Sequence, residues 1–285
     1  MGESLFFVNF AAMNEFSLLM SVYKGEKAIH LKTCFDSIYN QNVPPTEIVL
    51  VEDGELSREV YEVLVEEEKR FPQLRRLPLS ENQGLGTALN IGLEACRYPI
   101  VARMDTDDIC LPHRFEVQIQ FMQEHPEIDV LGAWISEFDD EPTNVVSIRS
   151  LPEKHDDICK FAKKRNPMNH PVVMFRKHAI IDTGGYQPCP LFEDYFLWVR
   201  MLQKGHRFHN LQQSLLLFRR SPEMIRRRGG ITYTRYEIDF FKRLHHLGYI
   251  TYPNMALNIL QRYVVRLLPN TIRGLIYKYL LRATP

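Results

Sequence analysis

The first hundred residues alternate between short apolar runs and segments in which apolar residues recur at a helical spacing. The apolar runs predict four strands, at 16–22, 47–51, 75–79 and 99–104. The periodic segments predict three helices, at 28–41, 57–71 and 84–97. Strands that alternate with helices form βαβ units and a parallel sheet. We therefore expect an α/β fold, Rossmann-like, with a mostly parallel central sheet flanked by helices.

The second half of the chain is less regular. Its pattern predicts helices at 112–125 and 193–204, and strands at 129–138, 144–149, 170–175 and 214–218. From Pro222 onward the pattern is helical and basic. We place a soft boundary near Arg220, with an α/β domain over 14–220 and a basic helical C-terminal extension over 221–285.

Charge is distributed unevenly although the formal net charge is zero. Residues 200–285 carry 16 Lys and Arg against 3 Asp and Glu, which leaves 19 against 32 in residues 1–199. A basic end on an otherwise acidic chain indicates an anionic partner. Membrane lipid, pyrophosphate and nucleic acid are all eligible on charge alone.

Composition indicates a globular protein that stays in the cytoplasm. The 285 residues are 45% hydrophobic and 25% charged, enough for a full core. No run reaches the roughly 18 apolar residues of a spanning helix, and the apolar stretch Ser4 to Met13 lacks a preceding basic flank. Translation from Met1 or from Met13 is equally compatible with a first strand at Phe16. Five cysteines without a C-x-x-C pair are expected to be reduced packing residues.

Polar clusters follow the first, second and fourth predicted strands, where the ligands of open parallel sheets bind. After the fourth strand, Asp105, Asp107 and Asp108 place three carboxylates within four residues. Their mutual repulsion is costly unless a cation lies among them, and hard oxygen ligands favour Mg²⁺ or Mn²⁺. Taken alone, the same residues are about as well explained as the turn before the helix that opens at Pro112.

Two weaker motifs also lie at these strand ends. Glu52-Asp53-Gly54 offers a carboxylate to a ribose or base, but a plain turn explains it equally well. Asn82 to Gly86 could direct backbone N–H groups at an anion. Glycines are, however, common turn residues before a helix, and no phosphate-loop lysine is present.

Glu193 and Asp194 open a predicted helix, where acidic residues commonly complement the helix dipole. A transferase that substitutes at an anomeric carbon needs a carboxylate base for the acceptor hydroxyl and a metal for the leaving diphosphate. Asp194 and the three aspartates supply a candidate for each role. His170 is either a core histidine or a site residue, and Arg200 either faces a diphosphate or pairs with an acid on its own helix.

Seven segments, in order, resemble the family 2 glycosyltransferases of bacterial polysaccharide synthesis, which have the GT-A fold. They are LLMSVY (18–23), IVLVEDG (48–54), NQGLGTALNIG (82–92), RMDTDD (103–108), HPVVMFR (170–176), GGY (184–186) and EDYFLWVR (193–200). Each motif is loose, but seven in register over residues 16–220 are a specific signal.

The resemblance implies a role for each matching residue. Donor-binding residues would be Ser21, Tyr23, Asp53, Asn82, Gly84, Asp105 and Asp107. Asp194 would be the catalytic base of an inverting displacement without a covalent intermediate, and Glu193, His170 and Arg200 would face the acceptor or diphosphate. Mn²⁺ or Mg²⁺ would bind Asp107, then Asp105, with Asp108 as the additional acid. The expected donor is a nucleotide-diphosphate sugar, with UDP as the nucleotide, and the expected acceptor is a glycan on a polyprenyl diphosphate.

Two other functions stay open at this point. One is a catalytically silent nucleotide-sugar-binding subunit. The other is a sugar nucleotidyltransferase, although its usual glycine-rich and basic N-terminal loop is missing.

The C-terminal stretch 259–282 is apolar, carries five basic residues and has no acidic one. This composition suits helices that lie on anionic lipid at the inner face of the cell membrane, broken at Pro269. A basic helix that packs on its own domain is the alternative. Arg226 to Arg228 could meet a pyrophosphate or lipid head groups, and no nucleic-acid recognition module is present.

Overall fold

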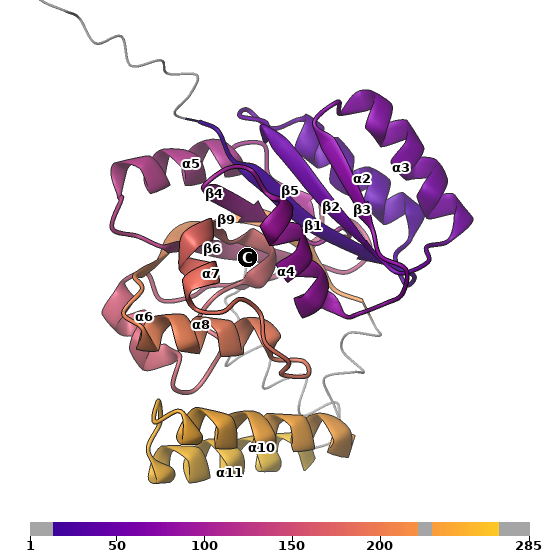
Figure 1. Cartoon of the computed structure of the whole chain (residues 1–285). Helices are drawn as coiled ribbons and strands as arrows, with labels where there is room; N and C mark the ends of the chain where they lie inside the picture. The colour runs from indigo at the N-terminus through magenta and orange to yellow at the C-terminus, as the bar shows by residue number, and fades with distance from the viewer. Residues whose placement is uncertain (1–13, 222–229, 268–285) are drawn as a thin grey trace, which may run out of the picture.

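The computed structural model describes residues 14–221 and 230–267. The predicted Rossmann-like half is present as four parallel strands in the order β3-β2-β1-β4 (Figure 1). The strands are β1 Ser17–Tyr23, β2 Glu47–Asp53, β3 Leu74–Pro78 and β4 Ile100–Arg103. The connecting helices are α2 Ala28–Tyr39, α3 Arg58–Arg70 and α4 Leu85–Ala95. This part of the sequence prediction is confirmed.

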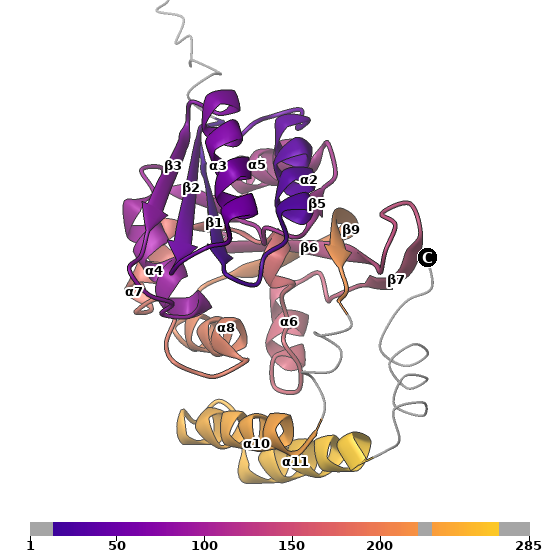
Figure 2. The ribbon, with the colours of Figure 1, turned by 90° about the vertical axis from the view of Figure 1, so that its right-hand side faces the viewer.

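The central strands are buried on both faces, which is why they appear in the sequence as unbroken apolar runs. Leu18, Met20 and Leu50 pack on the side of α2 and α3, whereas Leu19 and Val49 pack on the side of α4. A separate helix layer therefore covers each face of the sheet, as Figures 1 and 2 show.

Beyond β4 the nine-stranded sheet becomes mixed. It continues through β8 Met174–Arg176, β6 Val130–Phe138, β9 Phe208–Arg219 and β5 Ile109–Cys110, while β7 Val145–Arg149 pairs with the second half of β6. β8 is antiparallel to β4 and β6, whereas β6 and β9 are parallel. α5 Arg114–Glu124 packs on the same face as α2 through Phe115, and α8 Glu193–Gln203 packs on the opposite face through Leu197. The sheet is thus parallel in its first half and mixed in its second.

The sequence prediction was wrong in two places here. The strand expected at 170–175 is a 3₁₀ helix, η1 His170–Val172, followed by the short β8, because Pro171 has no N–H to donate to a ladder. β9 is longer than the predicted 214–218, because its pairing with β6 shifts near Trp134 and polar residues interrupt the apolar run there. The short helices α6 His155–Phe161 and α7 Lys177–Asp182 escaped prediction because fewer than eight residues show no usable periodicity.

The described part of the C-terminal region contains two helices that lie side by side, α10 Gly230–His246 and α11 Tyr252–Leu267 (Figure 2). α10 packs on α8, and the rings of Phe240 and Tyr195 are 4.5 Å apart. No helix in the described ranges is long and apolar enough to cross a membrane. The apolar stretch 4–13, Arg226 to Arg228, and most of 259–282 with Pro269 lie outside the described residues.

Candidate active site at the carboxyl edge of the parallel strands

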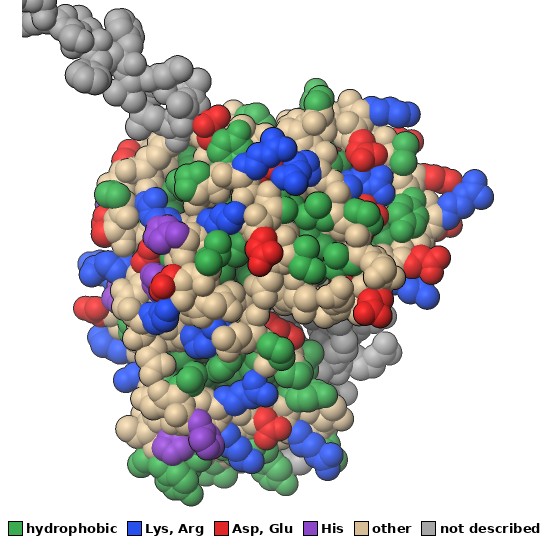
Figure 3. All heavy atoms as spheres, in the orientation of Figure 1, with side chains coloured by type: hydrophobic (Ala, Val, Ile, Leu, Met, Phe, Trp, Pro, Cys, Tyr) green, Lys and Arg blue, Asp and Glu red, His purple; other side chains and the backbone are tan. Residues whose placement is uncertain are grey.

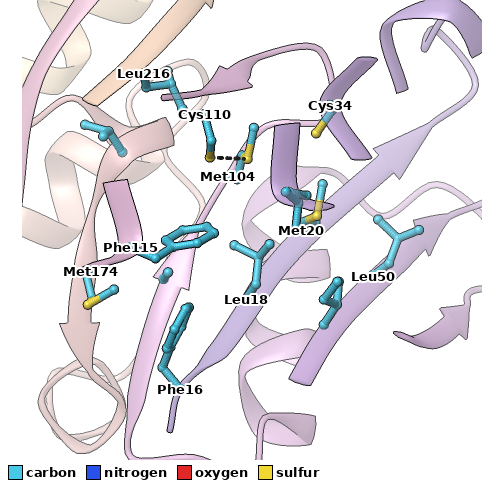
Figure 4. Packing of buried hydrophobic residues seen from close by; sticks show 14 of the residues in the cluster. Phe16, Leu18, Met20, Cys34, Leu50, Met104, Cys110, Phe115, Met174 and Leu216 are labelled. Carbon is cyan, nitrogen blue, oxygen red and sulfur yellow. Dashed lines mark hydrogen bonds between the residues drawn. The ribbon is translucent and has the colours of Figure 1, made fainter. Parts of the chain in front are cut away.

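The loop that carries the aspartates is fixed at both ends by buried residues. Met104 and Cys110 flank Asp105 to Asp108, and both belong to the core drawn in Figure 4. The Cys110 Sγ lies 3.2 Å from the Met104 Sδ, and the Arg114 guanidinium donates to the Arg103 carbonyl at 2.6 Å. All five cysteines are free, as expected. A rigid apolar base therefore presents the aspartates at the edge of the sheet.

Asp105, Asp107 and Asp108 come together as predicted, with one oxygen from each within 4.8 Å of the others. Asp108 is fully buried and accepts from the Arg219 backbone N–H at 2.9 Å, while its Oδ2 has no hydrogen-bond partner within the described chain. Burial, with Asp105 and Glu26 nearby, raises the pKa of Asp107 to about 7. Burial likewise raises the pKa of Asp108. Three carboxylates in a desolvated cluster, one with an unpaired oxygen, are a donor set suited to a hard divalent cation.

Sequence analysis missed two residues of this cluster. The carboxylate of Glu26 accepts from the Thr106 hydroxyl and, at 2.8 Å, from the Lys27 N–H. Burial raises its pKa, and Asp105 adds to the shift. Arg219, at the end of β9, donates from Nε to the Asp107 carbonyl at 3.0 Å. Neither position has a local motif, because Glu26 lies in a polar turn and Arg219 in a basic segment.

Asp53 organises the neighbouring loop at the end of β2. Its carboxylate accepts from the Gln83 N–H at 2.7 Å, the Gly84 N–H at 3.1 Å and the Asn82 side-chain amide at 3.0 Å. Gly54 is required beside it, because a Cβ at this position would lie 2.7 Å from the Asn82 nitrogen and φ is +84°. Asp53, Asn82 and Gly84 thus form one unit at the start of α4.

Ser21 and Tyr23 lie beside this unit on the parallel neighbour of β2. Tyr23 pairs with Asp53, and Ser21 pairs with Val51. Tyr23 is 48% exposed, and its ring covers Gly25, where an added Cβ would meet it at 2.5 Å. The residues expected to hold the nucleoside therefore share one corner of the sheet edge.

Asp194 lies in the first turn of α8, and its Oδ2 accepts from the Asn166 side-chain amide at 2.6 Å. Burial raises the pKa of the Asp194 carboxyl, and the hydrogen bonds from Asn166 and the Tyr195 backbone oppose that shift. Asn166 is a further residue that sequence analysis missed, because nothing in the segment around it distinguishes this asparagine from an ordinary loop residue.

Arg103 connects the aspartate cluster with the Asp194 region. It is 1% exposed, and its guanidinium donates to the Asp105 carboxylate. Its charge also opposes the burial that raises the pKa of Asp194, after the two hydrogen bonds and Arg149 in size, and it adds to the burial that lowers the pKa of His170. Two of its nitrogens have no acceptor among the described residues. One buried cation therefore binds the aspartate cluster and acts electrostatically on Asp194.

His170 contacts Tyr186, with its Nε2 2.8 Å from the tyrosine hydroxyl oxygen. Burial lowers the pKa of His170, so its ring is neutral at pH 7. The Asn90 side chain holds the Tyr186 backbone on both sides, at 2.8 Å each. The 184–186 segment of the resemblance is thus the turn that places Tyr186 against His170.

Glu193 and Arg200, the remaining predicted site residues, take different positions. Glu193 lies next to Gly86 in α4, where an added Cβ would be 3.6 Å from its Cγ, and burial raises its pKa. Arg200 donates to the carbonyls of Thr183 at 2.7 Å and Gly185 at 2.5 Å. We had expected Arg200 to contact a diphosphate or to pair with an acid on its own helix. Its partners are instead backbone carbonyls. Its guanidinium stabilises the 183–185 turn.

The half-parallel, half-mixed sheet of the described residues, with aspartates at its carboxyl edge, is the GT-A fold seen in solved glycosyltransferases. A mannosyltransferase from Pyrobaculum calidifontis, solved with GDP-Man and Mn²⁺, superposes with a TM-score of 0.64 at 14% identity, over 93% of this chain and 81% of that one. TarS 1–349 of S. aureus, in complex with UDP-GlcNAc, superposes with a TM-score of 0.61 at 16% identity, over 81% of this chain and 66% of that one.

The chain belongs to glycosyl transferase family 2, whose family model matches residues 17–184. It is 38% identical to the Escherichia coli UDP-Gal:alpha-D-GlcNAc-diphosphoundecaprenol beta-1,3-galactosyltransferase, over 94% of this chain and 97% of the relative. It is 40% identical to the amylovoran biosynthesis glycosyltransferase AmsE of Erwinia amylovora, over 92% and 98%. The resemblance found in the sequence, to glycosyltransferases of bacterial polysaccharide synthesis, is confirmed.

Proposed function

We propose that the protein is a metal-dependent, inverting glycosyltransferase that moves a sugar from a UDP-sugar to a hydroxyl of a glycan on a polyprenyl diphosphate. The E. coli relative, matched over almost its entire length, is named for a UDP-sugar donor and a diphosphoundecaprenol-linked acceptor. Two other relatives are named for amylovoran biosynthesis and for O-antigen biosynthesis. We place the protein in the same kind of pathway.

One observation carries the proposal: the buried Arg103 donates to a carboxylate of the aspartate cluster, and its charge also acts on Asp194, a carboxylate on another element. Tyr186 also faces both acids, since each adds to the burial that raises its pKa. We therefore place the aspartate cluster and Asp194 in one site, where a leaving diphosphate and an acceptor hydroxyl would occupy opposite sides of a sugar.

Asp194 acts as the general base in this proposal. The carboxylate takes the proton of the acceptor hydroxyl while the acceptor oxygen attacks the anomeric carbon and the bond to the diphosphate breaks. One direct displacement inverts the anomeric configuration, and no covalent sugar-enzyme species forms. Its position at the N-terminus of α8 favours the ionised form that the base requires.

Asp107, Asp105 and Asp108 would hold the metal, Mn²⁺ or Mg²⁺. The Asp108 Oδ2 has no hydrogen-bond partner in the described chain, and Asp107 is desolvated. Two such carboxylates repel each other, and a bound cation would neutralise this repulsion. When bound, the ion would neutralise charge on the leaving diphosphate. Asp107 is the first choice of metal ligand, because Asp105 already accepts from Arg103 and Asp108 from the Arg219 backbone.

Ser21, Tyr23, Asp53, Asn82 and Gly84 would form the donor nucleoside pocket. The three hydrogen bonds already made by Asp53 support a second role, in which its carboxylate sets the shape of the 82–84 loop. Glu193 and the neutral His170 would lie on the acceptor side.

The C-terminal region would hold the enzyme on the cytoplasmic face of the membrane, where a lipid-linked acceptor is presented. Leu257, Leu260 and Tyr263 lie on α11 with exposures of 50%, 59% and 51%, and α11 contains no acidic residue. Hydrophobic side chains gather over α10 and α11 at the lower end of the molecule in Figure 3. An apolar stripe on a helix without negative charge suits the surface of an anionic membrane.

The test of the proposal is Asp194→Asn, which keeps the shape of the side chain and removes the base. We expect turnover to fall by roughly 10²- to 10⁴-fold, with Mn²⁺-supported UDP binding unchanged by calorimetry. Asp156→Asn is the matched control, because Asp156 is an exposed acid in the first turn of α6, and it should keep the wild-type turnover. A near wild-type rate for Asp194→Asn would remove Asp194 from the base role.

The same assay separates the two other functions. UDP binding without sugar transfer from any UDP-sugar, in wild-type protein supplied with a polyprenyl-diphosphate glycan, would indicate a silent binding subunit. Release of pyrophosphate from a nucleoside triphosphate and a sugar phosphate would indicate a nucleotidyltransferase.

A further inference from the structure

We propose that Asn166 is a positioning residue for the reaction: its side-chain amide fixes the orientation of the Asp194 carboxylate. This inference rests on the proposed function, because it takes Asp194 as the base. Asn166 precedes η1 in the chain and lies 28 residues before Asp194.

The amide of Asn166 can face Asp194 in only one way. Its Oδ1 accepts from the Met168 backbone N–H at 3.3 Å, so the Nδ2 group is the one directed at the Asp194 Oδ2, at 2.6 Å. An acceptor is required at Oδ1 and a donor at Nδ2, which is the division that only an amide side chain of this length supplies. The hydrogen bond to the carboxylate is charge-assisted and therefore among the stronger kinds.

The segment around Asn166 is itself held firmly. The Pro167 carbonyl accepts from the buried Asn210 side chain at 3.2 Å, and Met168 is fully buried. Asn169, also fully buried, donates to the Ala133 carbonyl of β6 at 2.8 Å. A rigid segment anchored to the sheet thus carries the donor, so the position of Asp194 is set by the sheet as well as by its own helix.

Asp194 has further partners, and each one affects its ionisation. The Tyr195 backbone N–H supplies a second hydrogen bond that lowers its pKa. The titratable and charged groups that act on Asp194, or that it acts on, are Arg103 of β4, Arg149 of β7, Tyr186 and Cys189 of the segment before α8, and Glu193 of α8. Asn166 supplies the side-chain hydrogen bond to the carboxylate, and its effect on the pKa follows burial directly in size.

Loss of this donor has two consequences for a base. A carboxylate without its hydrogen bond is more easily protonated, so the pKa of Asp194 rises. The base works only when ionised, so the acid limb of the rate profile moves to higher pH. A carboxylate that turns more freely is also misaligned for part of the time, which lowers the rate on the pH plateau.

The experiment measures kcat/KM against pH for wild type, Asn166→Asp and Asn166→Ala. Asn166→Asp has the same shape and keeps an acceptor for Met168, but it places a second carboxylate where the donor was. We expect the acid limb to move up by about one pH unit in Asn166→Ala and by more in Asn166→Asp, where two carboxylates compete for one proton. The plateau rate should fall about tenfold. Donor KM and UDP binding should stay as in wild type.

Asn144→Asp is the matched control, since it adds the same charge at an exposed turn away from Asp194. Thermal denaturation of each variant identifies a general loss of folding, which would lower the plateau without moving the limb. An unmoved acid limb in both Asn166 variants, in a protein that Asp194→Asn inactivates, overturns the role of Asn166 alone. Activity retained in Asp194→Asn would instead refute the proposed function.

Discussion

Asp53 has two proposed roles, to contact the donor nucleoside and to hold the 82–84 loop. Asp53→Asn separates them, because only the role in the loop operates without a ligand. Asp53 is 3% exposed, and its carboxylate accepts three hydrogen bonds from residues 82–84. An asparagine has nearly the same shape but replaces one accepting oxygen with a donating NH₂ group. At least one of the three donors would then face another donor inside the protein.

The loss of these hydrogen bonds lowers the free energy of unfolding. A hydrogen bond to a charged group contributes about 1.5–3 kcal/mol, and a buried donor left without an acceptor costs about 1–3 kcal/mol. With one of the three bonds lost and the charge removed from the other two, we expect the free energy of unfolding to fall by about 3 kcal/mol. For a chain of this size that corresponds to a decrease in Tm of about 6–12 °C.

The assay is urea unfolding of the protein without nucleotide or metal, followed by circular dichroism. Asp140→Asn, at an exposed position, is the control for the loss of one negative charge. Unchanged stability in Asp53→Asn would refute the reasoning, and it would mean that the carboxylate serves the nucleoside and does not hold the loop.

Three further predictions follow from the aspartate cluster and the C-terminal helices. Asp107→Ala should weaken Mn²⁺-supported UDP binding by tenfold or more, on the order expected for a lost metal ligand, and unchanged binding by calorimetry would place the metal elsewhere. Because burial raises the pKa of Asp107 from 3.8 to about 7, the folded protein keeps a proton there that the unfolded chain loses above pH 4. Without metal, Asp107 should therefore lower stability as pH rises from about 4 to 7, by up to about 1.4 kcal/mol per unit. Urea unfolding in EDTA should show a smaller slope in Asp107→Asn, with the rest of the slope left by Asp108 and Glu26, whose pKa values burial also raises. Leu260→Glu should lower binding to anionic liposomes about tenfold in sedimentation, whereas Ile181→Glu on α7, also about half exposed, should not; equal binding would leave α11 as a helix that only packs on its own domain.

The sequence by itself determined the parallel half of the sheet and the edge at which the site forms. β1 and β2 are buried on both faces, so their apolar runs are visible without knowledge of their neighbours. Asp53 is the last residue of β2, Asp105 to Asp108 come one residue after β4, and the carboxyl ends of parallel strands meet at one edge. Local order along the chain was sufficient for both conclusions.

The tertiary structure alone decided which partners these side chains have. Asn166 and Asp194 are 28 residues apart, and Asp53 is about 30 residues from the loop that it holds. Arg200 turned out to bind two backbone carbonyls, and the strand expected at His170 became a 3₁₀ helix. Periodicity reports only what lies a few residues away, whereas a hydrogen bond between distant residues depends on how the sheet and helices pack. The order of motifs therefore revealed where the chemistry lies, and the packing decided how each group is oriented and charged.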